Sequence, residues 1–530
     1  MLVKVASSLV LAHLALMLSL VSKNIRCNKI FSMKKQFLKY TFIVSLGVLG
    51  ALGQGCSKID KFGDTNFDPN TTPNPVPSAL LTSVLSGTGG LVFDGNFYRN
   101  TSTQGMYCQY FTQSQYTEEA RYAIPDYNWD VFFAGSDADN VGIMPGANLF
   151  DLQNIINYVS KPENAATAVL YGSVKNQIAV ARILKAYLFW NLTDQYGDMP
   201  YKEALKNTDA VPYTEQKDIY PDLLKELKEA TAQFDSGEMP QGDIWFNGNK
   251  DKWIKFANSL RLLIALRMSK INPATAQTEY NSALSAGVIE DNSQNAKLDY
   301  PGGARFMNPF YEFAAVIKRS DVAVTNVVIN QLKNTNDRRR AVFGSSEVGF
   351  PYGLTREDAV LFSNANPTWA RPFAASYRQP TSPMYILTAA HIWLSRAEAA
   401  NLGWGGDAAT AYKNGIEASW KQWGVFDQTA FDAFMASPAI ALTTDATKKI
   451  ITQEWLAFFP DGRQGWAIWR KTGLPELAPA PGANLAIPRR IPYGSNERNL
   501  NTNAYKQAAA RYTVNSSENS YYGRVWWDKQ

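Results

Sequence analysis

The sequence predicts a mainly α fold, in which tetratricopeptide-like helix pairs form a scaffold and long irregular segments form loops. The first observation is helical periodicity, because apolar residues recur at roughly three- and four-residue intervals in several separate stretches. The second is that these stretches come as neighbours joined by short breaks, as in helical repeats. No strict repeat length can be read, so the tetratricopeptide-like part of this prediction rests partly on the sequence motifs described below.

Residues 1–55 have the features of a leader that ends in a lipoprotein signal. A basic start at Met33 is followed by the apolar stretch 40–52, then by small residues and Cys56. This order is typical of a bacterial lipoprotein signal, and the apolar stretch is too short to span a bilayer comfortably. Cleavage before Cys56 would leave its thiol for diacylglycerol and its amine for acylation, so acyl chains would provide the membrane anchor.

Two features of the leader leave alternatives open. Gly53 stands three positions before Cys56, where such signals usually carry an aliphatic residue, so an ordinary secretory signal is the alternative. A second apolar run, residues 9–21, precedes Met33. We therefore expect Met33 to be the true start, with a genuine two-segment leader as the alternative.

Charge and cysteine content narrow the possible classes of protein. Residues 1–55 hold seven of the 52 basic residues and none of the 47 acidic ones, so the remaining chain is close to neutral. No long basic run remains there, which excludes nucleic acid as a partner. Cys27 and Cys56 belong to the leader and its junction, which leaves Cys108 without a disulfide partner in the body of the protein.

The chain after Cys56 divides into a tether and one large domain. Residues 56–77 are polar and rich in Asn, Asp and Pro, and we interpret them as a lipidated tether. Residues 78–530 form the predicted single domain. The expected helices cover residues 174–192, 219–234, 253–263, 384–402, 408–423 and 451–458. A glycine-rich break at residues 403–406 makes the fourth and fifth of these an antiparallel pair.

Two long stretches of the domain lack clean periodicity and are rich in Gly, Pro, Asn and aromatic residues. We call residues 112–146 the first loop segment and residues 291–380 the second loop segment. The tail after Phe459 is also predicted to be irregular. Long irregular segments in a folded domain often carry function, so a ligand site is expected on the two loop segments.

Ten short motifs resemble those of the SusD/RagB family of nutrient-binding lipoproteins, and they look most like its second, more divergent subfamily. They keep the family order over almost the whole chain after the leader. They are NLTDQYGDMPYKEA (191–204), KWIKFANSLRLLIALRMS (252–269), NPFY (308–311), NDRR (336–339), LSRAEAANLGW (394–404), YKNGIEASWKQWGV (412–425), ITQEWLAFF (451–459), IWRKTGLP (468–475), IPRRIPY (487–493) and RVWWD (524–528).

The resemblance carries its own expectations about fold, partner and location. It implies a SusD-like fold of tetratricopeptide-like helix pairs, with loops that hold the ligand. It also implies a surface lipoprotein of the Gram-negative outer membrane, which covers a SusC-like, TonB-dependent barrel as a lid. Family ligands are mostly glycans, with peptides or other nutrients in some members. We therefore expect the protein to bind a nutrient, most simply an oligosaccharide, and to deliver it to such a transporter.

The residue inventory offers little for catalysis or metal binding. His391 is the one histidine outside the leader, and its helical, apolar surroundings favour a packed or capped role over that of a catalytic base. Residues 137–148 faintly resemble a calcium loop, but Val141 stands at the fifth position, where an oxygen ligand is needed, and Asn148 at the twelfth, where a Glu is needed, so a polar turn is favoured. We predict no enzyme activity, no metal and no cofactor.

Two alternatives to the transporter-associated binding protein remain open. One is a protein-interaction scaffold that uses its helical repeats as an adaptor. The other is a lipid-anchored glycan hydrolase, because such an enzyme needs only two carboxylates roughly 5–9 Å apart and Asp and Glu are common here.

Aromatic residues of the two loop segments are the predicted ligand site. Flat rings stack on the C–H faces of sugars, and charged or amide groups bond to the hydroxyl rims. The candidates are Tyr116, Tyr122, Trp129, Tyr311, Tyr352, Trp369, Arg371 and Tyr377. Trp129 and Trp369 are preferred, since each lies in a polar, turn-rich context. The alternative for each ring is that it pins its loop to the scaffold.

Lipidation is the prediction that the leader generates. Cys56→Ala should abolish labelling by a fatty-acid analogue and release the protein from the membrane fraction, because the acylated residue is the only anchor that the leader provides. Unchanged labelling of the variant would refute the assignment of Cys56.

Overall fold

The computed structural model describes residues 75–92, 103–123, 129, 132–133, 148–206, 210–303 and 306–529. Residues 75–530 group as one unit, separate from residues 1–74. Cys56 and most of the predicted tether lie outside the described residues, as do residues 137–147 of the calcium-like sequence. The first described helix, α3, begins at Pro77, the residue at which the tether was predicted to end.

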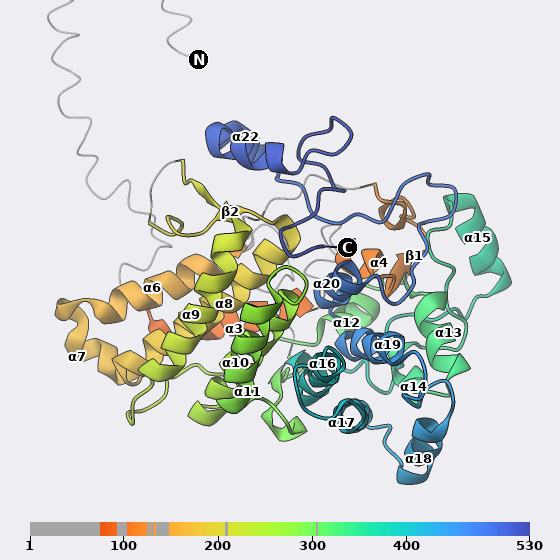
Figure 1. Cartoon of the computed structure of the whole chain (residues 1–530), viewed down its shortest axis with the longest axis horizontal. Helices are drawn as coiled ribbons and strands as arrows, with labels where there is room; N and C mark the ends of the chain where they lie inside the picture. The colour runs from red at the N-terminus through yellow and green to blue at the C-terminus, as the bar shows by residue number, and fades with distance from the viewer. Residues whose placement is uncertain are drawn as a thin grey trace, which may run out of the picture. The chain divides into compact units, whose positions relative to one another are not determined.

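The described residues are mainly helical, as the periodicity predicted (Figure 1). The longer helices are α3 (Pro77–Val92), α6 (Leu149–Ser160), α8 (Val174–Tyr196), α9 (Gln216–Gln233), α10 (Lys250–Arg267), α11 (Pro273–Ser285), α16 (Ala389–Asn401), α17 (Ala408–Gln422), α19 (Ala446–Phe458) and α20 (Gly462–Thr472). Many of them begin at a polar side chain that accepts a hydrogen bond from the first turn, which satisfies an otherwise unpaired backbone donor. Asn148, Asn249, Asp407 and Asp461 do this for α6, α10, α17 and α20.

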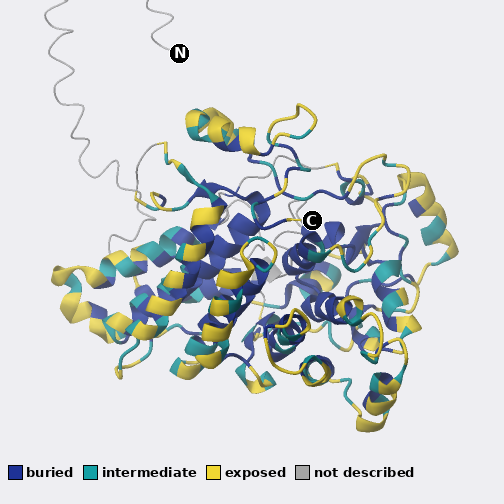
Figure 2. Ribbon diagram, in the orientation of Figure 1, coloured by how far each residue is buried: buried dark blue, intermediate teal, exposed yellow. Residues whose placement is uncertain are grey.

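These helices pack as antiparallel neighbours, in keeping with a tetratricopeptide-like scaffold. The contacting pairs include α6 with α8, α8 with α9, α10 with α11, and α16 with α17. Their buried faces form most of the core, while α15 (Arg356–Ala365) and α22 (Thr502–Arg511) expose most of their surface (Figure 2). A second apolar cluster, which includes Leu394, Ile416 and Trp420, joins α16, α17 and α19.

Short helices and two-stranded sheets complete the described part of the chain. The short helices are α4 (Thr103–Tyr107), η2 (Glu119–Arg121), η3 (Pro162–Asn164), α7 (Ala165–Ala168), η4 (Val169–Tyr171), η5 (Asn292–Gln294), α12 (Pro309–Tyr311), η6 (Glu312–Val316), α13 (Asn326–Asn334), α14 (Arg340–Phe343), α18 (Gln428–Ala436) and α21 (Ser495–Leu500). The strands pair antiparallel as β1 (Phe111–Gln113) with β5 (Val322–Val324), β2 (Met199–Pro200) with β3 (Tyr213–Thr214), and β4 (Ala296–Leu298) with β6 (Met384–Leu387).

Three predictions about secondary structure were wrong in detail. Residues 384–387 form a strand, because β4 supplies backbone partners and Thr388 then caps a helix that begins only at Ala389. The tail after Phe459 is not irregular, since it contains α20 and two further helices. The second loop segment also contains α13 and α15, whose short lengths hide their periodicity.

His391 is a packed and capped helix histidine, as favoured from the sequence. Its Nδ1 accepts a hydrogen bond from the Thr388 N–H, and its Nε2 lies 3.0 Å from the carbonyl oxygen of Ala457. The ring stacks on Phe458 with the centroids 3.9 Å apart. Burial lowers the pKa of His391 to about 3, so the neutral ring joins α16 to α19 at physiological pH.

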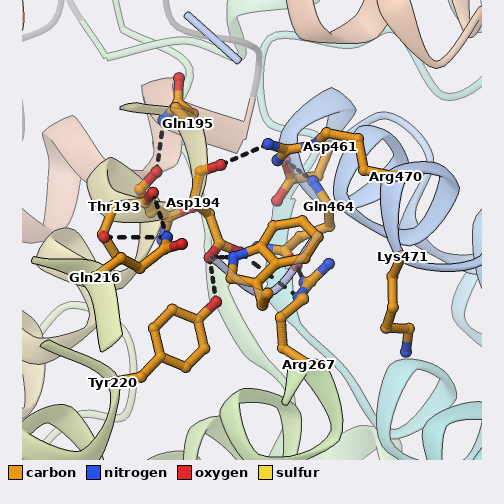
Figure 3. Close-up of polar contacts among 12 residues, drawn as sticks. Thr193, Asp194, Gln195, Gln216, Tyr220, Arg267, Asp461, Gln464, Arg470 and Lys471 are labelled. Carbon is orange, nitrogen blue, oxygen red and sulfur yellow. Dashed lines mark hydrogen bonds and ion pairs between the residues drawn. The ribbon is translucent and has the colours of Figure 1, made fainter. Parts of the chain in front are cut away.

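A network of buried polar residues centres on Asp194, near the C-terminal end of α8 (Figure 3). Its carboxylate accepts hydrogen bonds from the hydroxyl of Tyr220 on α9 and, at 2.9 Å, from Nε1 of Trp527. The same carboxylate lies 3.6 Å from Nε of Arg267 on α10. Burial raises the pKa of Asp194, while Arg267, the Tyr220 hydrogen bond and Arg470 oppose that rise. One side chain therefore contacts α9, α10 and the C-terminal segment.

Two buried guanidinium groups lie over the ring of Trp527 in this network. Cζ of Arg267 lies 5.2 Å from the ring centroid of Trp527, and Cζ of Arg470, on α20, lies 4.7 Å from it. Arg470 also donates to the carbonyl oxygen of Asp194 at 2.7 Å. Burial lowers the pKa of Arg470 to about 9, and Asp194 opposes this effect. Such cations are tolerated in a core only when they are paired and hydrogen-bonded.

The turn after α8 is fixed by Gly197, which has φ 83° and ψ −123°, a conformation nearly confined to glycine. A Cβ at this position would lie 2.1 Å from the hydroxyl oxygen of Tyr512. The chain passes from this glycine into β2, and the backbone N–H of Asp198 donates to the hydroxyl of Tyr512 at 2.9 Å.

Removing the central carboxylate should destabilise the whole domain. Asp194→Ala leaves Arg267 buried without its acidic partner and removes a negative charge that favours the charged form of Arg470, so we expect the free energy of unfolding to fall by about 3–5 kcal/mol. The measurement is urea denaturation followed by circular dichroism. Asp432→Ala, at an exposed position of α18, is the matched control and should change stability by less than about 0.5 kcal/mol. Equal stability of the two variants would contradict the role of Asp194.

Candidate ligand-binding site

The two loop segments meet through the short sheet of β1 and β5. Phe111, Thr112 and Gln113 pair with Val324, Ala323 and Val322. The backbone N–H of Ser114 extends this ladder by donating to the carbonyl oxygen of Asp321 at 2.8 Å. Residues more than 200 positions apart in the sequence are thereby held side by side, as the prediction of a shared site requires.

A pocket of about 220 Å³ lies beside this sheet, and we call it the loop pocket. Apolar side chains and three arginines line it. The lining residues are Phe310, Phe313, Ala314, Arg319, Ser320, Val322, Arg371, Pro372 and Arg378. No Asp or Glu is among these described lining residues, so their formal charge is positive.

One wall of the loop pocket is a short helical segment that changes from the α-helical α12 to the π-helical η6. Asn308 caps α12 by accepting from the backbone N–H of Phe310 at 2.9 Å, and its amide donates to the carbonyl oxygen of Ser382. The chain then continues as η6, a single π-helical turn. Such turns are rare and occur frequently at functional sites. Here the turn carries Phe313 into the pocket wall, next to the exposed Val316.

Arg319 connects the two loop segments at the mouth of the loop pocket. Its Cζ lies 5.4 Å from the ring centroid of Tyr116 and 5.3 Å from that of Phe313. The guanidinium also donates to both carboxylate oxygens of Asp321, at 2.9 and 2.5 Å. Tyr116 is 51% exposed, so one ring face is available beside a fixed cation.

The nearby carboxylate of Glu119 carries only part of a negative charge near neutral pH. Burial raises its pKa to about 7, Arg319 lowers it, and Asp321 raises it further. Its oxygen accepts a hydrogen bond from the amide of Gln113. Asp321 is thus bound to Arg319 and Glu119 is partly protonated, so neither of these two carboxylates carries a full unpaired charge.

Arg371 and Arg378 form the opposite wall. Cζ of Arg371 lies 4.0 Å above the ring of Trp369, and its Nη1 donates to the Trp369 carbonyl oxygen at 3.3 Å. Nη1 of Arg378 donates to the carbonyl oxygen of Pro372 at 3.4 Å. Among the described residues neither guanidinium forms an ion pair with a carboxylate. Burial lowers the pKa of both, and Arg371 lowers that of Arg378 further.

The chain matches the family model SusD-like_2, "Starch-binding associating with outer membrane", over residues 69–494. This match spans well over half of the sequence. The chain belongs to this SusD-like family. Among curated proteins, none matches it.

Solved structures show the same SusD-like fold. A chitin-binding protein is 28% identical with a TM-score of 0.70, and the match covers 86% of this chain and all of that one. A SusD homolog from Bacteroides uniformis is 23% identical with a TM-score of 0.68 over 85% of this chain and 99% of its own. A chitin-binding SusD homolog from Flavobacterium johnsoniae is 22% identical with a TM-score of 0.65 over 86% and 98%.

Four of the eight predicted site residues lie in the core of this SusD-like fold. Tyr122, Trp129, Tyr352 and Trp369 are all buried, with Trp129 and Trp369 only 4% exposed. Trp129 packs against three tyrosines and donates to Glu497, whereas Trp369 packs edge-on against Phe350 and lies under Arg371. This burial argues against the preference for Trp129 and Trp369 as stacking platforms, although Trp129 also lines a separate apolar pocket.

The other four predicted residues keep partial exposure and stay candidates. Tyr116 and Arg371 contact or line the loop pocket, as described above. Tyr311 is half-buried in α12. Tyr377 is also half-buried, but its ring packs on Phe373 and its hydroxyl donates to the carbonyl oxygen of Pro383 at 2.7 Å. Tyr377 therefore braces the loop, and a ligand would reach only its edge.

Sequence reasoning missed Phe313, Arg319 and Arg378, and it also missed the exposed ring of Phe306. The available signal was the density of aromatic and basic residues in residues 306–319 of the second loop segment. That signal does not reveal which of these side chains face the pocket, because this depends on the π-helical turn and on strand pairing.

Two larger pockets of about 530 Å³ each are alternative candidates for the ligand site. One lies between α6, α8 and α9, where Arg182 is bound to Glu226 at 2.9 Å and Lys185 to Gln153 at 2.6 Å. Four basic and two acidic residues line it, so its formal charge is also positive, but none of its lining aromatic rings is exposed. The other lies beside Trp129 and has mostly apolar lining. Neither combines an exposed aromatic face with unpaired cations.

The described ranges of the chain contain no cluster of His, Cys, Asp and Glu that could hold a metal ion. Within the same residues, no helix has the length and apolar character needed to cross a membrane.

The corrected site predicts opposite responses to two aromatic substitutions. Trp369→Ala should lower the free energy of unfolding by about 3–5 kcal/mol, because it empties a buried site. Tyr116→Ala removes a ring that is half in solvent and should lower it by less than about 1 kcal/mol. Urea denaturation of both variants measures the difference. A Trp369→Ala protein as stable as the wild type would show that this ring is not part of the core.

Proposed function

We propose that the protein binds an oligosaccharide at the loop pocket and presents it, chemically unchanged, to an outer-membrane transporter. The observation that carries the proposal is the combination of the exposed ring of Tyr116 with guanidinium donors, drawn from both loop segments, at one pocket. The chitin-binding protein with 28% identity supports a carbohydrate as the ligand class.

Sugar recognition needs two kinds of contact, and the loop pocket supplies both. The exposed face of Tyr116, beside Arg319, can stack on the C–H face of a sugar ring. Arg319 and Arg371 carry N–H donors in a fixed fork that can bond to ring and hydroxyl oxygens. The bidentate contact of Arg319 with Asp321 holds the first fork, and the Trp369 ring holds the second. Such preorganised donors reduce the entropy lost on binding.

The proposed partner is a SusC-like, TonB-dependent transporter of the outer membrane, reached through a lipid anchor at Cys56. Two observations support this part of the proposal. The family description places such proteins in association with the outer membrane, and the leader has the order of a lipoprotein signal.

Purification in mild detergent, from cells that express the whole operon, should recover a large barrel subunit with the protein. Repeated recovery of the protein alone would contradict the partnership and leave the adaptor alternative in place.

We further propose binding without turnover. His391, the one histidine after the leader, is buried and neutral, and both of its ring nitrogens contact the backbone. The three arginines in the lining of the loop pocket cannot serve as general acids at neutral pH.

Incubation of a bound oligosaccharide with pure protein, followed by mass analysis, should return the oligosaccharide intact. Turnover that is lost on changing a single Asp or Glu would instead support the hydrolase alternative.

The binding proposal predicts a selective effect of Tyr116. Tyr116→Ala should weaken oligosaccharide binding by about tenfold to a hundredfold, because a stacking ring contributes about 1–3 kcal/mol. Calorimetric titration with a panel that includes chitin oligosaccharides measures the affinity. Tyr171→Ala, at a half-exposed tyrosine outside the loop pocket, is the matched control and should bind normally. Normal binding by Tyr116→Ala would place the site elsewhere.

A further inference from the structure

The loop pocket has an excess of positive charge that its own residues do not neutralise. Of its three arginines, Arg319 is bound to Asp321. Arg371 and Arg378 each donate one long hydrogen bond to a backbone carbonyl oxygen, and neither has a carboxylate partner among the described residues. A guanidinium carries five N–H donors, so most donors of these two side chains remain available to a ligand.

The two arginines also raise each other's electrostatic energy. Arg371 and Arg378 line one pocket, and the charge of Arg371 disfavours the charged form of Arg378. Partial burial beside Phe310, Phe313 and Pro372 weakens the solvation of both groups. A bound anion would offset both costs, because charge-assisted hydrogen bonds from two guanidinium groups are strong and geometrically specific.

The size of the pocket limits what can enter it. Its volume of about 220 Å³ is below the roughly 300–1,000 Å³ of sites that enclose a whole drug-sized ligand. One substituted sugar unit is a better match than a whole chain. The remaining units would then lie over the exposed ring of Tyr116 beside Arg319.

We propose that the loop pocket selects an anionic saccharide, whose carboxylate or sulfate group is held between Arg371 and Arg378. This inference rests on the proposed function and narrows its ligand to acidic glycans. The apolar wall formed by Phe310 and Phe313 contacts the C–H face of the charged unit, and the two guanidinium groups bond to its oxyanion. Neutral glycans of the same backbone lack the group that would neutralise the pair.

The test compares matched acidic and neutral ligands by calorimetric titration. Oligogalacturonate and its fully methyl-esterified form share a backbone and differ in charge, and a sulfated chondroitin oligosaccharide separates sulfate from carboxylate recognition. The variants are Arg378→Met, which keeps the apolar stem, and Arg378→Lys, which keeps the charge. Arg356→Met, at an exposed position of α15 outside the pocket, is the control. Melting temperatures establish that each variant is folded.

We expect at least one acidic oligosaccharide to bind more tightly than the neutral ester and to lose affinity as salt increases. Arg378→Met should weaken acidic binding by about tenfold to a hundredfold, Arg378→Lys by less, and Arg356→Met not at all. Equal affinity for the acid and its ester, or an equal loss of both in Arg378→Met, would overturn the inference. Binding of chitin oligosaccharides alone would also overturn it and leave the proposed function standing. Binding of no saccharide would overturn both.

Discussion

The pairing of Asp194 with Arg267 and Arg470 is the interaction on which the rest of the structure depends. Asp194 lies near the end of α8, and its carboxylate and backbone contact side chains from α9, α10, α20 and the C-terminal segment. These charges are buried and must be paired or hydrogen-bonded, so Arg267 also donates to Gln464 and Arg470 donates to the backbone oxygen of Asp194. Because such groups have few alternative partners in a core, the network fixes how α20 and the C-terminal segment sit on the helical scaffold.

Close backbone contacts link α20 to the chain segment that leads to the ligand site. A Cβ on Gly462 would lie 2.2 Å from the backbone nitrogen of Gly105 in α4, so only glycine permits this approach. Gly465 makes similar room for the ring of Tyr110. The chain then runs directly from α4 into β1, and β1 pairs with β5 beside the loop pocket. These contacts thus connect the helical scaffold to the loops that carry the site.

Periodicity predicted the main helices of the scaffold but not the site. In α9 the apolar positions Ile219, Leu223 and Leu227 face the core, so spacing locates the helix. In α20 the buried face includes Arg463, Arg470 and Lys471, whose charges conceal the same spacing. The buried state of Trp369 depends on Phe350 and Ala359, and the pocket joins residues more than 200 positions apart. Local sequence carries no information about such tertiary contacts.

The central claim is that the helical scaffold holds a ligand site on the loops, and hydrogen–deuterium exchange tests it most directly. Exchange would be measured by mass spectrometry with and without a bound oligosaccharide. The account predicts slower exchange in residues 306–320 and 371–379, with little change in α8, α9 and α10. Protection confined to α6, α8 and α9, around the pocket that contains Arg182 and Lys185, would contradict it and place the ligand on the scaffold itself.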